Sequence, residues 1–241
     1  MISPACRMDF VLTKQHKIGI MTADGSGLPT SAPSAKRSLK ELFPIHSGER
    51  RGDIIPLNFR MLLALRLASN LLQLLQTHWV PNGWSHEKVF FPVTTAAHQR
   101  SNLDIDPGRP FISTPFAKYI TQLQPQPTLE AREALLELGI LLLEIWYEET
   151  LEAHFSIEKR PTDYYECQSL AEKWLDDEKS DEMLYLYNKA ANYCIRNMIG
   201  SKWQHAGWED KELWNAVCGT IIEPLYKNYN DVMRSRWSVG G

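Results

Sequence analysis

Two apolar stretches decide the fold of this chain: MLLALRLASNLLQLL at residues 61–75 and EALLELGILLLEIW at residues 133–146. In the first, the polar residues Arg66, Ser69 and Asn70 recur every three or four positions, which places them on one narrow stripe of a helix. Leucine, alanine and methionine cover the rest of its circumference. Each stretch predicts a helix that is buried on most faces, and together they predict the middle of one core.

Glutamates recur at roughly helical spacing along the second stretch and share one face: Glu133, Glu137, Glu144 and Glu148. We expect this stripe to be solvated or to pair with a neighbouring basic residue. The alternative is that Glu144 is buried and paired, and serves the structure. The segment EETLEAHFSIEK (148–159) is acidic and amphipathic, so it predicts either a solvated extension of the helix or a dock for a basic partner through Glu148 and Glu152.

Composition sets the outer limits on function. A chain of 241 residues with 44% hydrophobic residues fits one large domain or two small ones with a sizeable core. The formal net charge is −3, from 26 basic and 29 acidic residues, which gives no bulk attraction to nucleic acid or to an anionic membrane. The apolar stretches are interrupted by Arg66, Asn70, Glu137 and Glu144, which argues against a membrane span.

The four cysteines predict a reducing compartment. Cys6, Cys167, Cys194 and Cys218 are scattered and form no C-x-x-C pair, so neither a zinc site nor a disulfide framework is indicated. The N-terminal residues MISPACRMDF lack the apolar core of a signal peptide. We therefore expect a cytoplasmic protein with partly buried thiols, without a metal ion or another cofactor.

The remaining pattern predicts one mainly α domain over residues 1–241 with a small β hairpin at its front edge. Its predicted parts are a front segment (8–57), a helical lobe (58–231) and a tail (232–241). Ser38 is a candidate helix cap, with Glu41 completing a capping box. The predicted strands are 9–12, 17–21, 88–93 and 110–113, and the predicted helices are 58–76, 130–147, 162–177, 182–198 and 210–228.

The order of these elements resembles the last part of a protein-kinase-like fold, from the strands before the hinge through the helical lobe. The sequence LALRLASNLLQLLQTHWV (63–80) is similar to the kinase helix that runs into the catalytic loop. The sequence LLELGILLLEIWYEE (135–149) is similar to the central segment S-x-G-x-x-L-x-E-L, with Gly139 and Glu144 at its Gly and Glu. The resemblance implies a kinase-like C-lobe.

More specifically, the chain resembles a family of fungal domains of unknown function that often follow HeLo-type prion-inhibition and propagation domains. Similar motifs in that family are an L-R-L-A-S-x-L-L-Q-L helix, a W-S-x-x-x-(I/V)-F-F strand, an F-I-S piece and an L-G-I-L-L-L-E-(L/I)-W helix. They match residues 65–74, 84–91, 111–113 and 138–146 here, within a resemblance that covers roughly residues 9–231. These motifs are structural, so they indicate fold rather than activity.

The kinase resemblance also shows which catalytic residues are missing. A kinase needs a catalytic Asp, metal-binding Asn and Asp residues, and a phosphate-binding Lys. Here Gly83 stands at the catalytic Asp and Lys88 at the metal-binding Asn, where a cation repels magnesium. Six positions are degenerate in this comparison: Pro81, Asn82, Gly83, Lys88, Ser113 and Ala134. No catalytic residue is therefore expected.

The expected function is a non-catalytic adaptor in fungal intracellular signalling, linked to self/non-self recognition or cell death, with a protein partner that the sequence does not identify. Arg234, Arg236 and Trp237 are candidate contact residues, because Arg and Trp are enriched at interface hot spots; a frayed terminus is the alternative. Two other functions stay open. One is an accessory metabolic enzyme that uses His86, His98 and Asp104, and the other is a truncated relic of a longer protein.

Overall fold

The computed structural model of this chain describes residues 9–12, 18–21, 36–43, 55–75, 85–93, 105, 110–112, 131–176, 183–196 and 210–238. The chain divides into two compact units, Met1–Lys36 and Arg37–Gly241. The boundary falls inside the predicted front segment 8–57.

The first unit contains the predicted hairpin. Strand β1 (Asp9–Leu12) pairs antiparallel with β2 (Ile18–Met21), with Asp9 opposite Met21 and Leu12 opposite Ile18. The two short apolar runs of the sequence therefore predicted both strands, and the start of β2 lies one residue later than expected.

Strand β3 (Lys36–Ser38) starts at the last residue of the first unit and continues into the second unit, where a 3₁₀ turn, η1 (Lys40–Leu42), follows it. Ser38 and Glu41 form the predicted capping box: the Glu41 N–H donates to Ser38 Oγ at 3.3 Å, and the Ser38 N–H donates to Glu41 Oε2 at 3.0 Å. This reciprocal pair turns the chain sharply, so that Leu39 and Leu42 enter the core.

Strand β3 belongs to a three-stranded sheet of order β3-β4-β5. The central strand β4 (Val89–Pro92) pairs antiparallel with β5 (Phe111–Ile112), with Val89 opposite Ile112. The sequence predicted both of these strands, at 88–93 and 110–113. Val89 and Phe91 are fully buried, whereas the residues between and after them are half-buried, so only one face of β4 meets the core.

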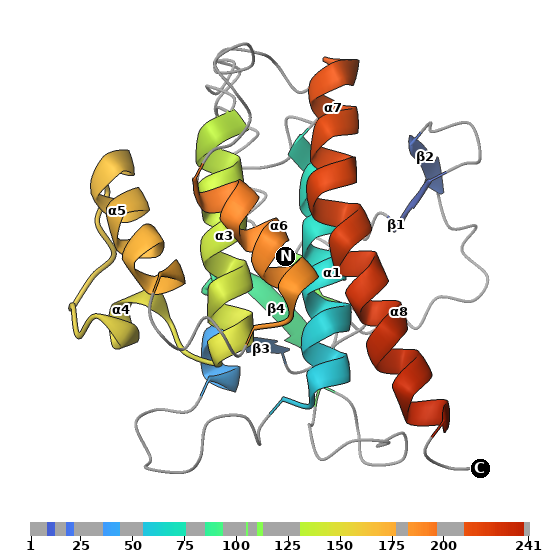
Figure 1. Ribbon diagram of the computed structural model, residues 1–241, viewed down its shortest axis with the longest axis horizontal. Coiled ribbons are helices and arrows are strands. Elements are labelled where there is room, and N and C mark those ends of the chain that lie inside the picture. The colour runs from blue at the N-terminus through green and yellow to red at the C-terminus, as the bar shows by residue number, and fades with distance from the viewer. Residues whose placement is uncertain are drawn as a thin grey trace, which may run out of the picture. The chain divides into compact units, whose positions relative to one another are not determined.

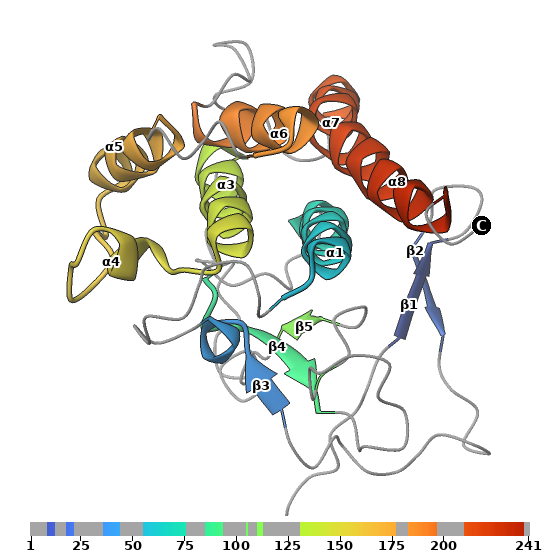
Figure 2. The same cartoon turned by 60° about the horizontal axis from the view of Figure 1, so that its bottom comes forward.

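The two apolar stretches form α1 (Leu57–Leu75) and α3 (Ala131–Tyr147), each within one or two residues of the predicted bounds. Figure 1 shows them side by side, α1 in cyan and α3 in yellow-green. Fourteen of the residues in α3 are buried, including Glu144, which makes α3 the centre of the helical unit. In Figure 2, α1 and α3 lie between the β3-β4-β5 sheet and the helices α6 and α8.

Short helices follow α3. These are α4 (Leu151–His154), α5 (Tyr164–Leu175) and α6 (Tyr185–Ile195). Thr150 caps α4 and Asp163 caps α5, because each side chain accepts a backbone N–H from the first turn. The predicted helices at 162–177 and 182–198 correspond to α5 and α6.

The C-terminal helix differs from the prediction. It consists of α7 (Lys211–Val217), a π-helical turn η5 (Cys218–Ile222) and α8 (Glu223–Ser238). Pro224, four residues before the predicted end at residue 228, lies in the first turn of α8, just after the wide turn, where a missing N–H is tolerated. The predicted tail at 232–241 is therefore helical as far as Ser238.

Helices α3 and α6 approach closely at Gly139. A Cβ atom on Gly139 would lie 2.6 Å from Ile195 Cγ1 and 2.9 Å from Cys194 Cβ, both in α6. Only hydrogen fits there, so the glycine permits the contact that buries α6 on α3. Among the described residues the fold is mainly α, and no described helix is both long enough and apolar enough to cross a membrane.

Candidate functional site

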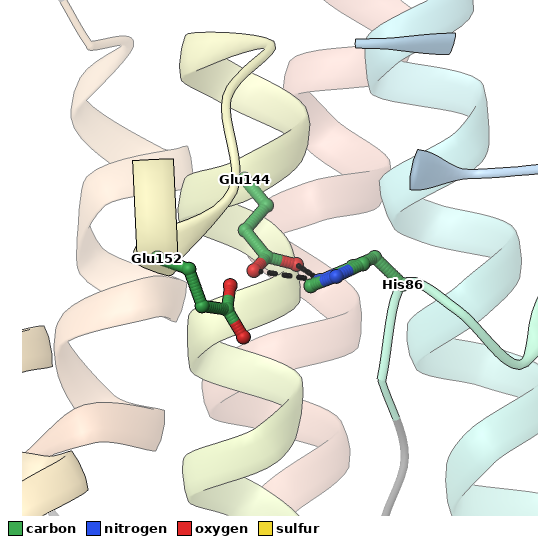
Figure 3. Close-up of side chains that lie close together, drawn as sticks. All are labelled: His86, Glu144 and Glu152. Carbon is green, nitrogen blue, oxygen red and sulfur yellow. Dashed lines mark hydrogen bonds and ion pairs between the residues drawn. The ribbon is translucent and has the colours of Figure 1, made fainter. Parts of the chain in front are cut away.

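Ionisable side chains converge along α3 and are largely buried. Glu144 is fully buried, and its carboxylate accepts hydrogen bonds from His86 Nδ1 at 2.9 and 3.0 Å. Glu152 of α4 points toward the same place, as Figure 3 shows. We call this group, with Glu137 and Arg160, the ion cluster: His86, Glu137, Glu144, Glu152 and Arg160.

His86 is placed by a turn directly before β4. The Lys88 N–H donates to the Ser85 carbonyl at 2.9 Å, and the Lys40 N–H donates to the His86 carbonyl at 3.4 Å. The side chain of His86 is 3% exposed. Because Nδ1 faces a carboxylate, it carries the proton of that hydrogen bond. The sheet is thereby connected to α3.

Arg160 closes the ion cluster. Its Nη2 donates to Glu144 Oε1 at 2.8 Å, and its Nη1 donates to Glu137 Oε2 at 2.8 Å. Its Nε lies 3.5 Å from Glu152 Oε1. Since the guanidinium presents donors in a planar fork, one side chain meets carboxylates from α3 and α4 together.

The electrostatics of the ion cluster are unbalanced toward negative charge, because three carboxylates surround one guanidinium. Burial raises the pKa of the Glu137 carboxyl to about 7; Arg160 and Lys88 oppose this rise, and Glu144 and Glu152 add to it. Burial lowers the pKa of the Arg160 guanidinium, but attraction to Glu144, Glu137 and Glu152 outweighs it and holds that pKa above its usual value. The raised pKa of the Glu137 carboxyl lies near neutrality.

Three members of the cluster also satisfy a simple test for a metal centre. Ligand atoms of His86, Glu144 and Glu152 lie within 4.8 Å of one another, and imidazole with carboxylates suits zinc. The Arg160 guanidinium, however, contacts the carboxylates of both Glu144 and Glu152. Because it already supplies the positive charge that a metal would bring, the contacts describe an ion cluster closed by arginine.

The chain around the ion cluster is held in a strained conformation. Glu148 ends α3 with φ = 54°, and the Glu149 N–H donates to the Glu144 carbonyl at 3.3 Å, as in a Schellman cap that normally uses glycine. Ser156 ends α4 with φ = 53°. Glu148 and Ser156 thus both have left-handed backbone conformations, although neither is glycine, and both lie in the segment that leads from α3 to Arg160. We call residues 148–160 the α4 corner.

Further contacts fix the end of α3. The Glu148 side chain accepts the buried Ile55 N–H at 2.6 Å, and Arg60 Nη1 donates to the Trp146 carbonyl at 2.6 Å. The Arg60 guanidinium also lies 5.4 Å from the centre of the Trp146 ring. Both contacts connect the region at the start of α1 to the end of α3, close to Glu144 of the ion cluster.

An aromatic stack covers the other side of the α4 corner. The ring of Trp174 from α5 lies 4.6 Å from His154 of α4 and 5.6 Å from Tyr147 of α3, with small interplanar angles of 16° and 24°. Trp174 is 1% exposed. The corner is therefore held on one side by charge and on the other by ring stacking.

The structure places only part of the degenerate kinase positions. Lys88 is half-buried in the turn before β4, and Ala134 is fully buried in α3. Pro81, Asn82, Gly83 and Ser113 lie outside the described residues. His98 and Asp104, which were expected to act with His86, also lie outside the described residues. The observed partner of His86 is Glu144.

The candidate contact residues divide into two groups. Glu148 is 2% exposed and its carboxylate accepts the Ile55 N–H, so this residue is not part of a solvated extension. The Glu152 side chain is 21% exposed and lies in the ion cluster, and a dock for a basic partner through these residues stays a prediction. Arg234 is exposed on α8, whereas the side chains of Arg236 and Trp237 lie outside the described residues.

Sequence reasoning anticipated a buried, paired Glu144 as one alternative but did not find its partners. Arg160 is sixteen residues away and His86 is fifty-eight away, so neither stands at helical spacing. The sequence contained one signal for this contact: Arg160 stands directly before Pro161, at the end of an acidic segment. That position does not reveal which carboxylate the arginine meets.

The comparison with known proteins identifies a family whose function is unknown. No curated protein and no solved structure matches the chain. The sequence profile of one family, described as "Domain of unknown function (DUF7580)", matches residues 6–232 and therefore covers both compact units almost completely. The chain belongs to the DUF7580 family of domains of unknown function.

Proposed function

We propose that this chain is a non-catalytic binding module, a degenerate kinase-like C-lobe that acts as an adaptor for another protein in the cytoplasm. We extend the proposal to fungal signalling in self/non-self recognition or cell death, because the motifs at 65–74 and 138–146 resemble domains that follow HeLo-type domains. The family match supports a shared domain and leaves the activity open.

The observation that carries the proposal is that the carboxylates of the ion cluster are bonded to groups of the same chain. Glu144 is fully buried, and its carboxylate accepts hydrogen bonds from His86, Arg160 and the Leu151 N–H. A carboxylate that is fully buried and bonded to three donors of its own chain is engaged in holding the structure together. Phosphoryl transfer needs carboxylates that face magnesium and the acceptor hydroxyl instead.

Two described positions of the kinase comparison support the proposal of a non-catalytic lobe. Ala134, which stands where active kinases carry an Asp that braces the catalytic loop, is fully buried among apolar residues of α3. Lys88, which stands at the metal-binding Asn, contributes a positive charge near Glu137. Both support a lobe whose helical frame is retained while its catalytic groups are lost.

The first test is an assay of phosphoryl transfer with purified protein, Mg²⁺ and ATP, using generic protein acceptors. We expect no transfer above a no-protein control, and no gain in Gly83→Asp or Lys88→Asn. Transfer by the wild-type chain that either substitution changes would contradict the non-catalytic reading. ATP binding without turnover is compatible with an adaptor and is measured separately by a thermal shift.

The second test is capture of a protein partner from native cells at near-endogenous level, followed by mass spectrometry. We expect a stoichiometric partner that is lost in Arg234→Ala or Trp237→Ala. Lys227→Ala is the matched control, because Lys227 is an exposed cation on the same helix and pairs only weakly with Glu223 in solvent. A partner retained equally in all variants would remove α8 from the interface, and a chain captured alone would favour the relic alternative.

The buried His86–Glu144 pair favours a second candidate function, that of an accessory metabolic enzyme. A carboxylate that orients an imidazole is a common part of acid–base sites. In that function His86→Gln would abolish turnover of a metabolite while partner capture stayed unchanged. If His86→Gln changes neither property, the pair serves the fold alone.

A further inference from the structure

We propose that His86, Glu144 and Glu152 form a zinc site in which Arg160 is the built-in competitor of the metal. The three side chains come from separate elements: the turn before β4, the helix α3 and the helix α4. In the structure the Arg160 guanidinium contacts the carboxylates of α3 and α4, and zinc takes its place between them when it binds. The proposal concerns only groups within the chain, so it is independent of the adaptor function.

The first observation is that the ligand atoms of these residues already lie close together. They are within 4.8 Å of one another, and His86 Nδ1 lies 2.9 Å from Glu144 Oε1 and 3.0 Å from Glu144 Oε2. Two ligands of a tetrahedral zinc ion are about 3.3 Å apart, because zinc bonds to nitrogen and oxygen are about 2.0–2.1 Å long. The histidine and the α3 glutamate therefore need only small shifts to share a metal ion, while the α4 glutamate has to move by roughly 1–2 Å.

The second observation is that Glu152 holds an oxygen atom without a donor. Among the described residues, its buried Oε2 accepts no hydrogen bond, and its Oε1 lies 3.5 Å from Arg160 Nε, which is longer than a charge-assisted hydrogen bond. A buried carboxylate oxygen that lacks a partner carries a cost in free energy. Figure 3 shows this carboxylate beside the His86–Glu144 pair. The donor-free oxygen thus points to a cation as its partner and leaves the side chain free to move toward it.

The charge of the ion cluster also favours a divalent cation. Three carboxylates surround one guanidinium, so their full ionisation leaves negative charge that Arg160 does not balance. The side chains of His86 and Glu144 are 3% and 0% exposed, so water screens little of this charge. A divalent cation between Glu144 and Glu152 neutralises both carboxylates and leaves Arg160 its bond to Glu137 at 2.8 Å.

The types of ligand select zinc among the common divalent ions. One imidazole and two carboxylates supply nitrogen and oxygen donors, and water can complete a four-coordinate site on the side where the Glu152 side chain is 21% exposed. Magnesium and calcium instead prefer a larger number of ligands that are mostly oxygen atoms. Zinc replaces the proton that His86 Nδ1 donates to Glu144, and the neutral imidazole then carries its proton on Nε2.

The test is a calorimetric titration of the full chain with zinc chloride alone, after a chelator has removed metal and with the thiols kept reduced. We expect the wild type to bind one zinc ion and to take up no magnesium. Glu152→Gln should weaken zinc binding at least about tenfold, because it removes a charged ligand. Glu149→Gln is the matched control, because Glu149 is 18% exposed in the same α4 corner and pairs with His154. It should bind zinc as tightly as the wild type.

Arg160→Met distinguishes a zinc site from a cluster that serves the fold alone. Without the guanidinium, zinc meets no competing positive charge at the two carboxylates, so it should bind this variant at least about tenfold more tightly than the wild type. A merely structural cluster predicts lower stability in this variant and no tighter zinc complex. Should Arg160→Met fail to fold, the comparison of Glu152→Gln with Glu149→Gln decides, because both side chains are partly exposed.

Three results would overturn the proposal. One is a wild-type chain that takes up no zinc at micromolar concentrations. Another is equal zinc affinity in Glu152→Gln and the wild type, which would assign the ion to an adventitious place such as the half-buried Cys218 thiol. The third is zinc binding in a folded Arg160→Met variant that is no tighter than in the wild type, which would show that the arginine does not compete with the metal.

Discussion

Arg160 Nη2 lies 2.8 Å from Glu144 Oε1, and this contact joins the end of the α4 corner to a carboxylate that is fully buried in the central helix. Neither residue could be placed there alone without a large cost, because a buried charge needs a partner with good geometry. The same pair therefore explains both how the corner folds back onto α3 and why the carboxylate is not free for chemistry.

The loss of Arg160 should lower the free energy of unfolding more than the loss of an arginine from an exposed ion pair. We expect Arg160→Met to lower the free energy of unfolding by about 3 kcal/mol, because it leaves buried carboxylates without their cation. Arg196→Met is the control. Arg196 pairs with Asp176, but these side chains are 38% and 63% exposed, so its loss should cost less than about 1 kcal/mol. Urea unfolding measures both, and similar losses would refute the distinction.

The close approach of α3 to α6 gives a prediction at Gly139. We expect Gly139→Ala to lower the free energy of unfolding by about 1–3 kcal/mol, because its methyl group would overlap Ile195 and Cys194. Gly219→Ala is the matched control. A Cβ at Gly219 meets nothing within 4 Å, so that variant should be unchanged or more stable by up to about 1 kcal/mol. Equal effects in the two variants would mean that the helices separate at little cost.

Glu148 offers a prediction whose sign depends on which of two effects is larger. Glycine would relieve the left-handed backbone at φ = 54°, which alone predicts a gain of about 1 kcal/mol. It would also leave the buried Ile55 N–H without its acceptor, at a cost of about 1–3 kcal/mol. We expect a net loss of stability in Glu148→Gly by thermal unfolding. A more stable variant would show that the side-chain contact contributes little.

Local patterns in the sequence predicted most of the fold. The bounds of α1 and α3 followed from apolar periodicity, and the Ser38–Glu41 box followed from a spacing of three residues that is read directly from the chain. The C-terminal helix was predicted to end at residue 228 but continues to Ser238, and a π-helical turn accommodates Pro224 in the first turn of α8. Local spacing does not reveal such a turn.

The candidate site was much harder to predict. Glu144 was recognised as a residue that could be buried and paired, but His86 and Arg160 meet it only because three separate elements pack together. Glu148 was expected near the surface because acidic residues usually lie there. Its burial depends on the αL end of α3 and on a backbone N–H near the start of α1, and no sequence pattern connects these two places.

The central claim is that the buried charged groups of the ion cluster pair with one another. A double-mutant cycle tests this claim most directly. Unfolding free energies at pH 7 are measured for the wild type, Glu144→Gln, Arg160→Gln and the double variant. We predict that the double variant loses about 2 kcal/mol less than the two single losses together, because each single change leaves the other residue unpaired. Losses that add within about 0.5 kcal/mol would show that the two residues act independently and would contradict the claim.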